Sequence, residues 1–153
     1  MSRWELLIPP PLVALLCATM MWGLAQVTPL AYSTGLWRFG LATALLTLGL
    51  LIALIAVVAF HRARTTIHPQ KPEQSERLVT HGIFRLSRNP MYLGMLLVLL
   101  AWLAWLAAPA AVIGPAAFIA WIRRFQIQPE ERILGKRFGE AYAQYCGNTR
   151  RWL

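Results

Sequence analysis

Long apolar runs separated by polar segments dominate the first 60 residues. The first run covers roughly residues 6–27, and its prolines, Pro9–Pro11, stand near its start, where the first amides of a helix have no partner to lose. The second run, Leu41–Phe60, contains no charged residue and gives about 30 Å of helix, which is enough to cross a bilayer. The pattern therefore predicts two membrane-spanning helices.

Two further apolar runs follow a polar segment that extends over residues 61–89. Met91–Ala108 predicts a third span and Ala110–Ile122 predicts a fourth, shorter one. We expect this helical hairpin to pack on the first two spans, with Gly94 and Gly114 allowing a close approach.

The tail, Pro129–Tyr145, predicts an amphipathic helix, because its apolar residues recur at helical spacing. The sequence thus predicts an all-α, multi-pass transmembrane bundle of about four spans, with a cytoplasmic loop and a C-terminal amphipathic helix.

The composition supports this class of protein. Apolar residues make up 58% of the 153 residues and charged residues only 14%, and a soluble domain of this length could not bury so much apolar surface. The net charge of +9 does not indicate nucleic acid, because the basic residues stand beside apolar spans, where Lys and Arg anchor to membrane lipid headgroups. The length predicts a single membrane domain over residues 1–153.

The basic residues also predict an orientation. With four spans, the N-terminus, the segment 61–89 and the tail lie on one side of the membrane, and every Lys and Arg except Arg38 lies on that side. The positive-inside rule makes it the cytoplasmic side. The polar segment and the tail can therefore meet, and both flank the third and fourth spans.

The stretch from Leu78 to Gly94 begins as a polar loop and ends inside an apolar helix. Its residues have ordinary interpretations one by one: Asn89 can cap a helix, Pro90 suits a first turn, and Tyr92 can lie at the membrane interface. Glu130 and Glu131 likewise suit the start of a helix. The same two carboxylates could instead hold a bound cation, or the ammonium and ribose hydroxyls of a ligand.

Several kinds of chemistry are not indicated. The histidines and the two cysteines show no metal-binding spacing, so no metal is expected. There is no Ser–His–Asp constellation, no phosphate-binding glycine loop and no soluble dinucleotide fingerprint.

Three separate blocks of residues carry a resemblance when they are taken together. The first block is Leu78-Val79-Thr80-x-Gly82-x-Phe84, and the second is Arg88-Asn89-Pro90-Met91-Tyr92-x-Gly94. The third is Glu130-Glu131-x-x-Leu134-x-x-x-Phe138-Gly139-x-x-Tyr142-x-x-Tyr145. In order and spacing they resemble the isoprenylcysteine carboxyl methyltransferase family, and the related phospholipid N-methyltransferases are similar over the same half. The resemblance covers about residues 66–151.

The resemblance implies an integral membrane methyltransferase that uses S-adenosylmethionine and acts on a lipophilic substrate at the cytoplasmic face. Residues 1–60 would then be two anchoring spans, and residues 61–153 a cofactor-binding half with a helical hairpin and the C-terminal helix. The cofactor-binding residues that it implies are His68, Leu78, Val79, Gly82, Phe84, Arg88, Asn89, Pro90, Tyr92, Glu130 and Glu131.

The chain departs from the family's pattern at two positions. The family often has His where this chain has Asn89, which keeps a hydrogen-bonding side chain. The prenylcysteine enzymes have an Arg that holds the substrate carboxylate four residues before the acid matching Glu130, and here that residue is Gln126. Arg123, Arg124 and Gln126 are therefore the candidates for orienting the substrate.

The choice of reaction rests on the absence of an evident general base. A carboxylate nucleophile is already ionised at neutral pH, whereas an amine must first lose a proton. This favours carboxyl O-methylation, with phospholipid N-methylation or thiol S-methylation as alternatives. A non-catalytic membrane assembly or lipid-binding protein is the alternative of another class, and a nicotinamide-dependent membrane reductase is a further enzymatic one.

Overall fold

The computed structural model describes residues 5–28, 35–62 and 78–153. Two of its helices, α1 (Pro10–Val27) and α2 (Trp37–Arg62), are long and apolar enough to cross a membrane. Helix α1 begins at Pro10, later than the predicted start near residue 6, because the backbone of Pro9 is extended. Helix α2 exceeds the predicted run at both ends, since residues 37–40 and 61–62, which flank the apolar run, are also helical.

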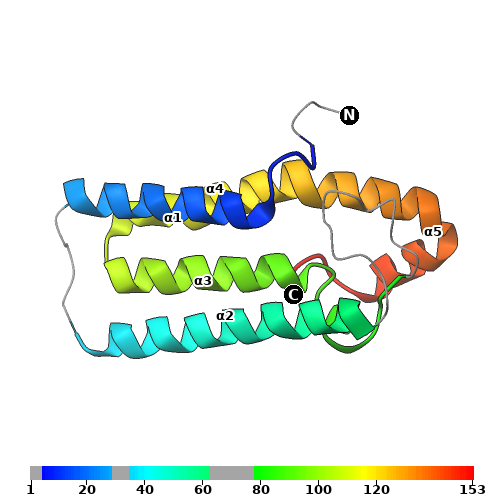
Figure 1. The fold of residues 1–153 in the computed structure, drawn as a ribbon, viewed down its shortest axis with the longest axis horizontal. Coiled ribbons are helices and arrows are strands. Elements are labelled where there is room, and N and C mark those ends of the chain that lie inside the picture. The colour runs from blue at the N-terminus through cyan, green and yellow to red at the C-terminus, as the bar shows by residue number, and fades with distance from the viewer. Residues whose placement is uncertain (1–4, 29–34, 63–77) are drawn as a thin grey trace.

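The second half of the chain adds α3 (Pro90–Leu106), α4 (Ile113–Ile122) and α5 (Gln128–Asn148), with short 3₁₀ turns η2 (Gly82–Arg85) and η3 (Pro109–Val112). Helix α3 ends where Ala107 adopts a left-handed backbone conformation. Helices α1 to α4 run alongside one another as a bundle (Figure 1). The prediction of an all-α membrane bundle is thus confirmed for the described part of the chain.

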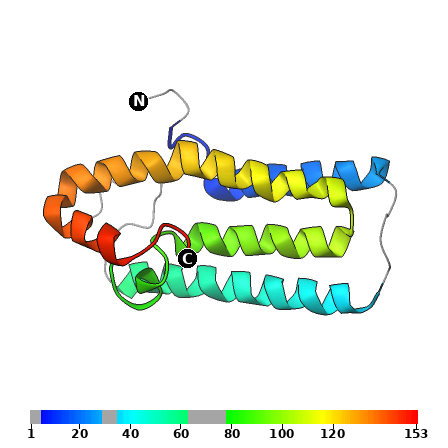
Figure 2. The ribbon, with the colours of Figure 1, turned by 180° about the vertical axis from the view of Figure 1, so that it is seen from behind.

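The sequence predicts the fourth apolar run and the tail as separate helices, but the structure joins them. A π-helical segment, η4 (Arg123–Ile127), joins α4 to α5, so that the chain continues as one long rod (Figure 2). Pro129 explains the π turn: it has no amide hydrogen, so Phe125 lacks the usual donor four residues on. The tail helix bends instead at Gly139, whose φ of 51° is not helical.

The bundle is tightest between α2 and α3, which pack along their whole length (Figure 1). At their crossing, a Cβ atom added to Gly94 would lie 2.7 Å from the carbonyl oxygen of Gly49. Gly114 of α4 likewise leaves no room for a side chain beside Met21 of α1. The predicted role of Gly94 and Gly114 in close helix packing is therefore confirmed.

Two hydrophobic clusters hold the fold together. The larger lies between α1, α3 and α4 and is centred on the fully buried Met21, Phe118 and Ile122. The smaller lies where the loop before α3 meets the end of α5, and it contains Phe84 and Tyr145. The outer faces of α1 and α2 remain strongly apolar and exposed, as expected of helices that face lipid.

Candidate functional site

The site lies at the end of the bundle where residues 78–89, the start of α3 and helix α5 come together (Figures 1 and 2). Gly82 has a φ of 61°, which allows the tight 3₁₀ turn that sends the Phe84 side chain into the smaller cluster. The Tyr145 hydroxyl donates a hydrogen bond of 2.6 Å to the carbonyl of Phe84. The predicted residues Leu78, Val79 and Phe84 therefore form one wall with the tail, and Val79 and Phe84 are buried in it.

A partly buried carboxyl group, that of Glu130, lies between α3 and α5. The Tyr92 hydroxyl donates to Oε1 of Glu130 at 2.5 Å. Burial raises the pKa of Glu130 to about 8, because its effect outweighs the hydrogen bond from Tyr92, which lowers the pKa; the neighbouring charge of Glu131 raises it further. At neutral pH this group is mostly uncharged, and a positive charge placed beside it would ionise it.

The second acid, Glu131, is held by two arginines. The Arg151 guanidinium donates from Nε and Nη2 to the two carboxylate oxygens at 2.9 and 2.7 Å, and Arg88 Nη2 lies 3.2 Å from Oε1. The hydrogen bonds that Arg151 donates to the Glu131 carboxylate raise the pKa of Arg151. Arg88 also contacts the Cys146 sulfur. We call this arrangement of Arg88, Glu131 and Arg151 the Glu131 clasp.

The last residues of the chain pass over the start of α3 as a strap, Thr149–Trp152. The Arg88 amide donates to the Arg150 carbonyl at 3.0 Å, and the Asn89 side-chain amide donates to the Arg151 carbonyl at 2.9 Å. Asn89 therefore binds the strap with its side chain and does not cap the helix with it, although Pro90 begins α3 as predicted. The Ser87 hydroxyl reaches the same Arg151 carbonyl at 3.4 Å.

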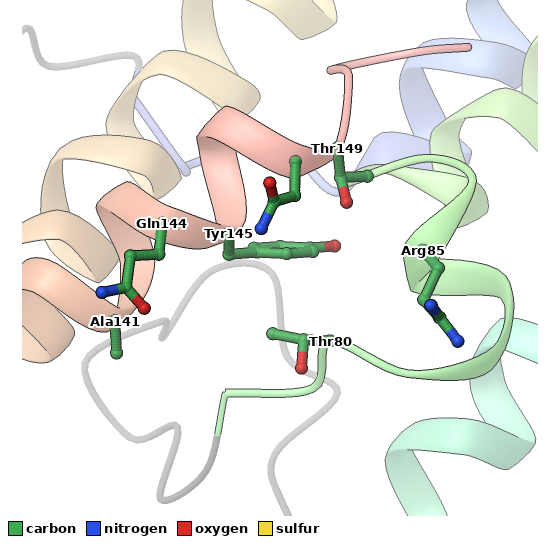
Figure 3. Close-up of a pocket in the computed structure, with 7 residues that line it drawn as sticks. Thr80, Arg85, Ala141, Gln144, Tyr145 and Thr149 are labelled. Carbon is green, nitrogen blue, oxygen red and sulfur yellow. The ribbon is translucent and has the colours of Figure 1, made fainter.

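A polar pocket of about 460 Å³ opens beside this wall (Figure 3). Figure 3 shows Thr80 and Arg85 of the loop facing Gln144 and Tyr145 of the tail helix. The full lining is Thr80, Arg85, Ala141, Gln144, Tyr145, Asn148 and Thr149. None of these is a residue that the resemblance had assigned to the cofactor, but Thr80 and Arg85 directly follow Val79 and Phe84.

The three substrate-orienting candidates lie in the π segment. Arg124 pairs with Glu5 at 3.2 Å, and the buried Gln126 donates from Nε2 to the Ile8 carbonyl at 2.7 Å. Both therefore contact the N-terminal segment, while Arg123 is exposed. Gln126 lies four residues before Glu130, but its side chain contacts the N-terminal segment, whereas the Glu130 carboxyl contacts Tyr92 of α3.

The structure adds residues that the sequence did not indicate. Arg151 stands after the end of α5, and nothing in its spacing pointed to Glu131. The pocket residues had a signal that could have been used: Ala141, Gln144, Tyr145 and Asn148 recur at helical spacing on one face of the tail. His68 lies outside the described residues. Within the described ranges no three His, Cys, Asp or Glu side chains gather as a metal site.

An apolar helical bundle with a polar, partly buried site at one end defines an integral membrane protein of the helical class. The sequence model of the phospholipid methyltransferase family matches residues 37–141. The chain therefore belongs to the phospholipid methyltransferase family, a family of enzymes.

Individual relatives agree with this assignment. Protein-S-isoprenylcysteine O-methyltransferase A of Arabidopsis thaliana is 30% identical over 113 residues, which are 72% of this chain and 56% of the plant protein. A probable protein-S-isoprenylcysteine O-methyltransferase of Oryza sativa subsp. japonica is 32% identical over 102 residues, 65% of this chain and 52% of that protein. An uncharacterized protein of Haemophilus influenzae is 48% identical over 63 residues, which are 41% of this chain and all of that protein. The chain thus spans about half the length of the plant relatives, and no solved structure matches it significantly.

Proposed function

We propose that this protein transfers a methyl group from S-adenosylmethionine to a lipophilic substrate, and that carboxyl O-methylation is the favoured reaction. The single observation that carries the proposal is the partly buried Glu130 carboxyl against Tyr92, within a member of a methyltransferase family. When bound, S-adenosylmethionine supplies an electrophilic methyl group on a sulfonium. The chain's own residues must then bind the cofactor, align the substrate with its methyl group and exclude water.

The acidic side chains suit the positive groups of this cofactor. Glu130 is mostly protonated at neutral pH, so it can remain buried without a counter-ion and ionise when a cation arrives. The Tyr92 hydroxyl keeps its carboxyl group in one position through the hydrogen bond at 2.5 Å. The Coulomb attraction between this carboxylate and a cation is stronger in such a partly buried site than in water.

The remaining groups of the site suit the polar parts of the cofactor. Arg88 and Arg151 can share a ligand carboxylate with Glu131, because their guanidinium groups already converge there. The polar pocket has a volume in the range of about 300–1,000 Å³ that is usual for small-molecule sites. Its Thr, Gln and Asn side chains offer hydroxyl and amide groups to a nucleoside. We therefore assign the pocket to the adenosine part, beside the Leu78, Val79 and Phe84 wall. The resemblance adds Gly82, Asn89 and Pro90 to the same site and His68 outside the described residues.

The substrate side follows from the surroundings of the site. The exposed apolar faces of α1 and α2 place the bundle in lipid, so a lipophilic or lipidated substrate would reach the site sideways between helices. A carboxylate substrate needs no general base. Arg123, Arg124 and Gln126 are the candidates to orient it. The four-span, cytoplasmic-site topology completes the proposal and rests on the distribution of basic residues.

Calorimetric titration of the purified protein with S-adenosylmethionine and, separately, with NADPH tests the cofactor. We expect S-adenosylmethionine to bind and NADPH not to bind. A protein that binds neither would be a non-catalytic membrane protein, and one that binds only NADPH would be a reductase. Transfer of labelled methyl groups then tests the substrate with three acceptors: a prenylated cysteine with a free carboxylate, phosphatidylethanolamine and a lipophilic thiol. If only the amine or only the thiol is labelled, the reaction is N- or S-methylation and the proposal of carboxyl O-methylation is wrong.

A further inference from the structure

The first described residues of the chain, residues 5–8, lie against the rod at the junction of α4 and α5 (Figures 1 and 2). We propose that the N-terminal segment Glu5–Ile8 positions the cofactor site, with Glu5 as a positioning residue, because it fixes the π-helical turn that presents Glu130 to Tyr92. The inference rests on the proposed function in one respect, the role of Glu130 in binding the cofactor. The N-terminal segment lies outside the part of the chain that the family model matches.

The π turn leaves a backbone carbonyl that the N-terminal segment satisfies. Pro129 cannot donate to Phe125, which would be its partner in a regular α-helix. The amide of Leu6 donates to the Phe125 carbonyl instead, at 3.0 Å. Leu6 has a φ of 60°, a conformation that is unfavourable for a residue with a side chain and persists only where the surroundings require it.

Side chains within and after the π turn connect the same two segments. The Glu5 carboxylate lies 3.2 Å from Arg124, near the start of the π turn, and 2.6 Å from Arg132, after its end. Its side chain is only 4% exposed, although both arginines are half exposed. Between them, the buried Gln126 donates to the Ile8 carbonyl at 2.7 Å. The segment therefore spans the π turn and holds its two ends in a fixed relation.

The rotational position of Glu130 depends on this turn. A π segment of this length winds less per residue than an α-helix, so its conversion to α-helix would rotate everything after it by roughly a quarter of a turn. Glu130 follows the segment by three residues, and its carboxyl group meets Tyr92 from α3 at 2.5 Å. A rotation of that size would remove the contact and expose the carboxyl group.

Two substitutions in the full chain, reconstituted in lipid nanodiscs, test the proposal from opposite sides. Glu5→Gln removes the charge that joins Arg124 and Arg132, and Pro129→Ala supplies the amide that lets Phe125 form a regular α-helical bond. Glu5→Asp keeps the charge and serves as the rescue variant. Glu140→Gln removes an exposed carboxylate from the same helix and serves as the matched control.

The first readout is the infrared band of the protonated Glu130 carboxyl, assigned with Glu130→Gln and followed against pH without cofactor. We expect Glu5→Gln and Pro129→Ala to lower the pKa of Glu130 from about 8 toward the ordinary range of a glutamate, because the carboxyl group is no longer covered by Tyr92 and α3. The charge of Glu131, which also raises this pKa, stays beside it in both variants. Glu5→Asp and Glu140→Gln should leave it in place. An unchanged band in both test variants, with helical content retained, would overturn the proposal.

The second readout is the dissociation constant for S-adenosylmethionine. It should rise about tenfold in both test variants, as for the loss of one hydrogen bond to a charged group. If the wild type binds no S-adenosylmethionine, the proposed function fails while the infrared result still decides the role of the N-terminal segment. If Glu5→Gln does not fold, Pro129→Ala decides, because it leaves the charges of Glu5, Arg124 and Arg132 unchanged. A lower melting temperature without a change in either readout would show a merely structural role and contradict the inference.

Discussion

The crossing of α2 and α3 and the junction of the loop with α5 are built on opposite principles. At the crossing, Gly49 and Gly94 bring two apolar helices together by backbone contact. At the junction, Tyr92, Glu130 and the Glu131 clasp hold polar groups through specific hydrogen bonds and ion pairs. Shape alone suffices where no chemistry is needed, whereas the junction keeps titratable groups buried, which is costly and typical of functional sites.

The largest effect is expected where the backbones touch. Gly94→Ala would place a methyl group 2.7 Å from the Gly49 carbonyl oxygen, so α2 and α3 must separate. We expect a loss of about 1–3 kcal/mol in the free energy of unfolding, as for other overpacked interiors. Gly23→Ala is the matched control, because nothing lies within 4 Å of a Cβ added there. Denaturant unfolding in detergent measures both, and equal stability of the two variants would contradict the tight crossing.

The next effect distinguishes a role of the Arg151 side chain from a role of the strap's backbone. Arg151→Ala leaves Glu131 with Arg88 alone, and we expect S-adenosylmethionine binding to weaken about tenfold, since a partly buried charge loses its bidentate partner. Arg150 contributes only its carbonyl in the described contacts, so Arg150→Ala should bind normally. Calorimetry of both variants measures this difference. Equal weakening would show that the strap acts through its backbone and not through the clasp.

A smaller effect is expected on the pH dependence of stability. The pKa of Glu130 is raised to about 8 in the folded protein from an ordinary 4.5, so the folded state binds the proton more tightly. Its contribution to stability is complete below the ordinary pKa and is lost as the pH rises through about 8. The melting temperature of the wild type should therefore fall from about pH 5 to 9, and that of Glu130→Gln should fall less. Each kcal/mol of unfolding free energy that is lost lowers the melting temperature by about 2–4 °C. Parallel curves for the two proteins would contradict a buried, protonated Glu130.

The smallest effect concerns the wall of the pocket. Tyr145→Phe removes the 2.6 Å hydrogen bond to the Phe84 carbonyl but keeps the ring in the smaller cluster. We expect a loss of about 0.5–1.5 kcal/mol in the free energy of unfolding. The adjacent Gln144 is exposed on the same helix, so Gln144→Ala is the neighbouring control, with no measurable loss expected. Equal effects would mean that the hydroxyl does not hold the loop to the tail.

Much of the bundle could be predicted because hydropathy acts over whole helices. The uncharged run in α2 and the proline-led starts of α1 and α3 determine where helices form, and small residues such as Gly94 and Gly114 mark where they meet. The continuity of α4 with α5 could not be read in this way. It depends on a π turn that a distant amide, that of Leu6, completes.

The site was predictable to a different extent. Spacing placed Tyr92 and Glu130 in separate blocks of one pattern, and the structure brings them into contact; their role in binding a cofactor stays a prediction. Arg151 could not be predicted, because its partner Glu131 is reached only after α5 bends at Gly139 and the strap returns over α3. Long-range partners of this kind have no periodic signal in the sequence.

Proton release on cofactor binding tests the central claim most directly. If the positive groups of S-adenosylmethionine lie beside Glu130, binding at neutral pH must ionise a carboxyl group whose pKa is about 8 in the free protein. Calorimetry in two buffers with different ionisation enthalpies counts the protons. We predict that the wild type releases close to one proton more than Glu130→Gln does, and that Glu130→Gln binds more weakly. Equal proton counts and equal affinities in the two proteins would contradict the assignment of Glu130 to the cofactor site.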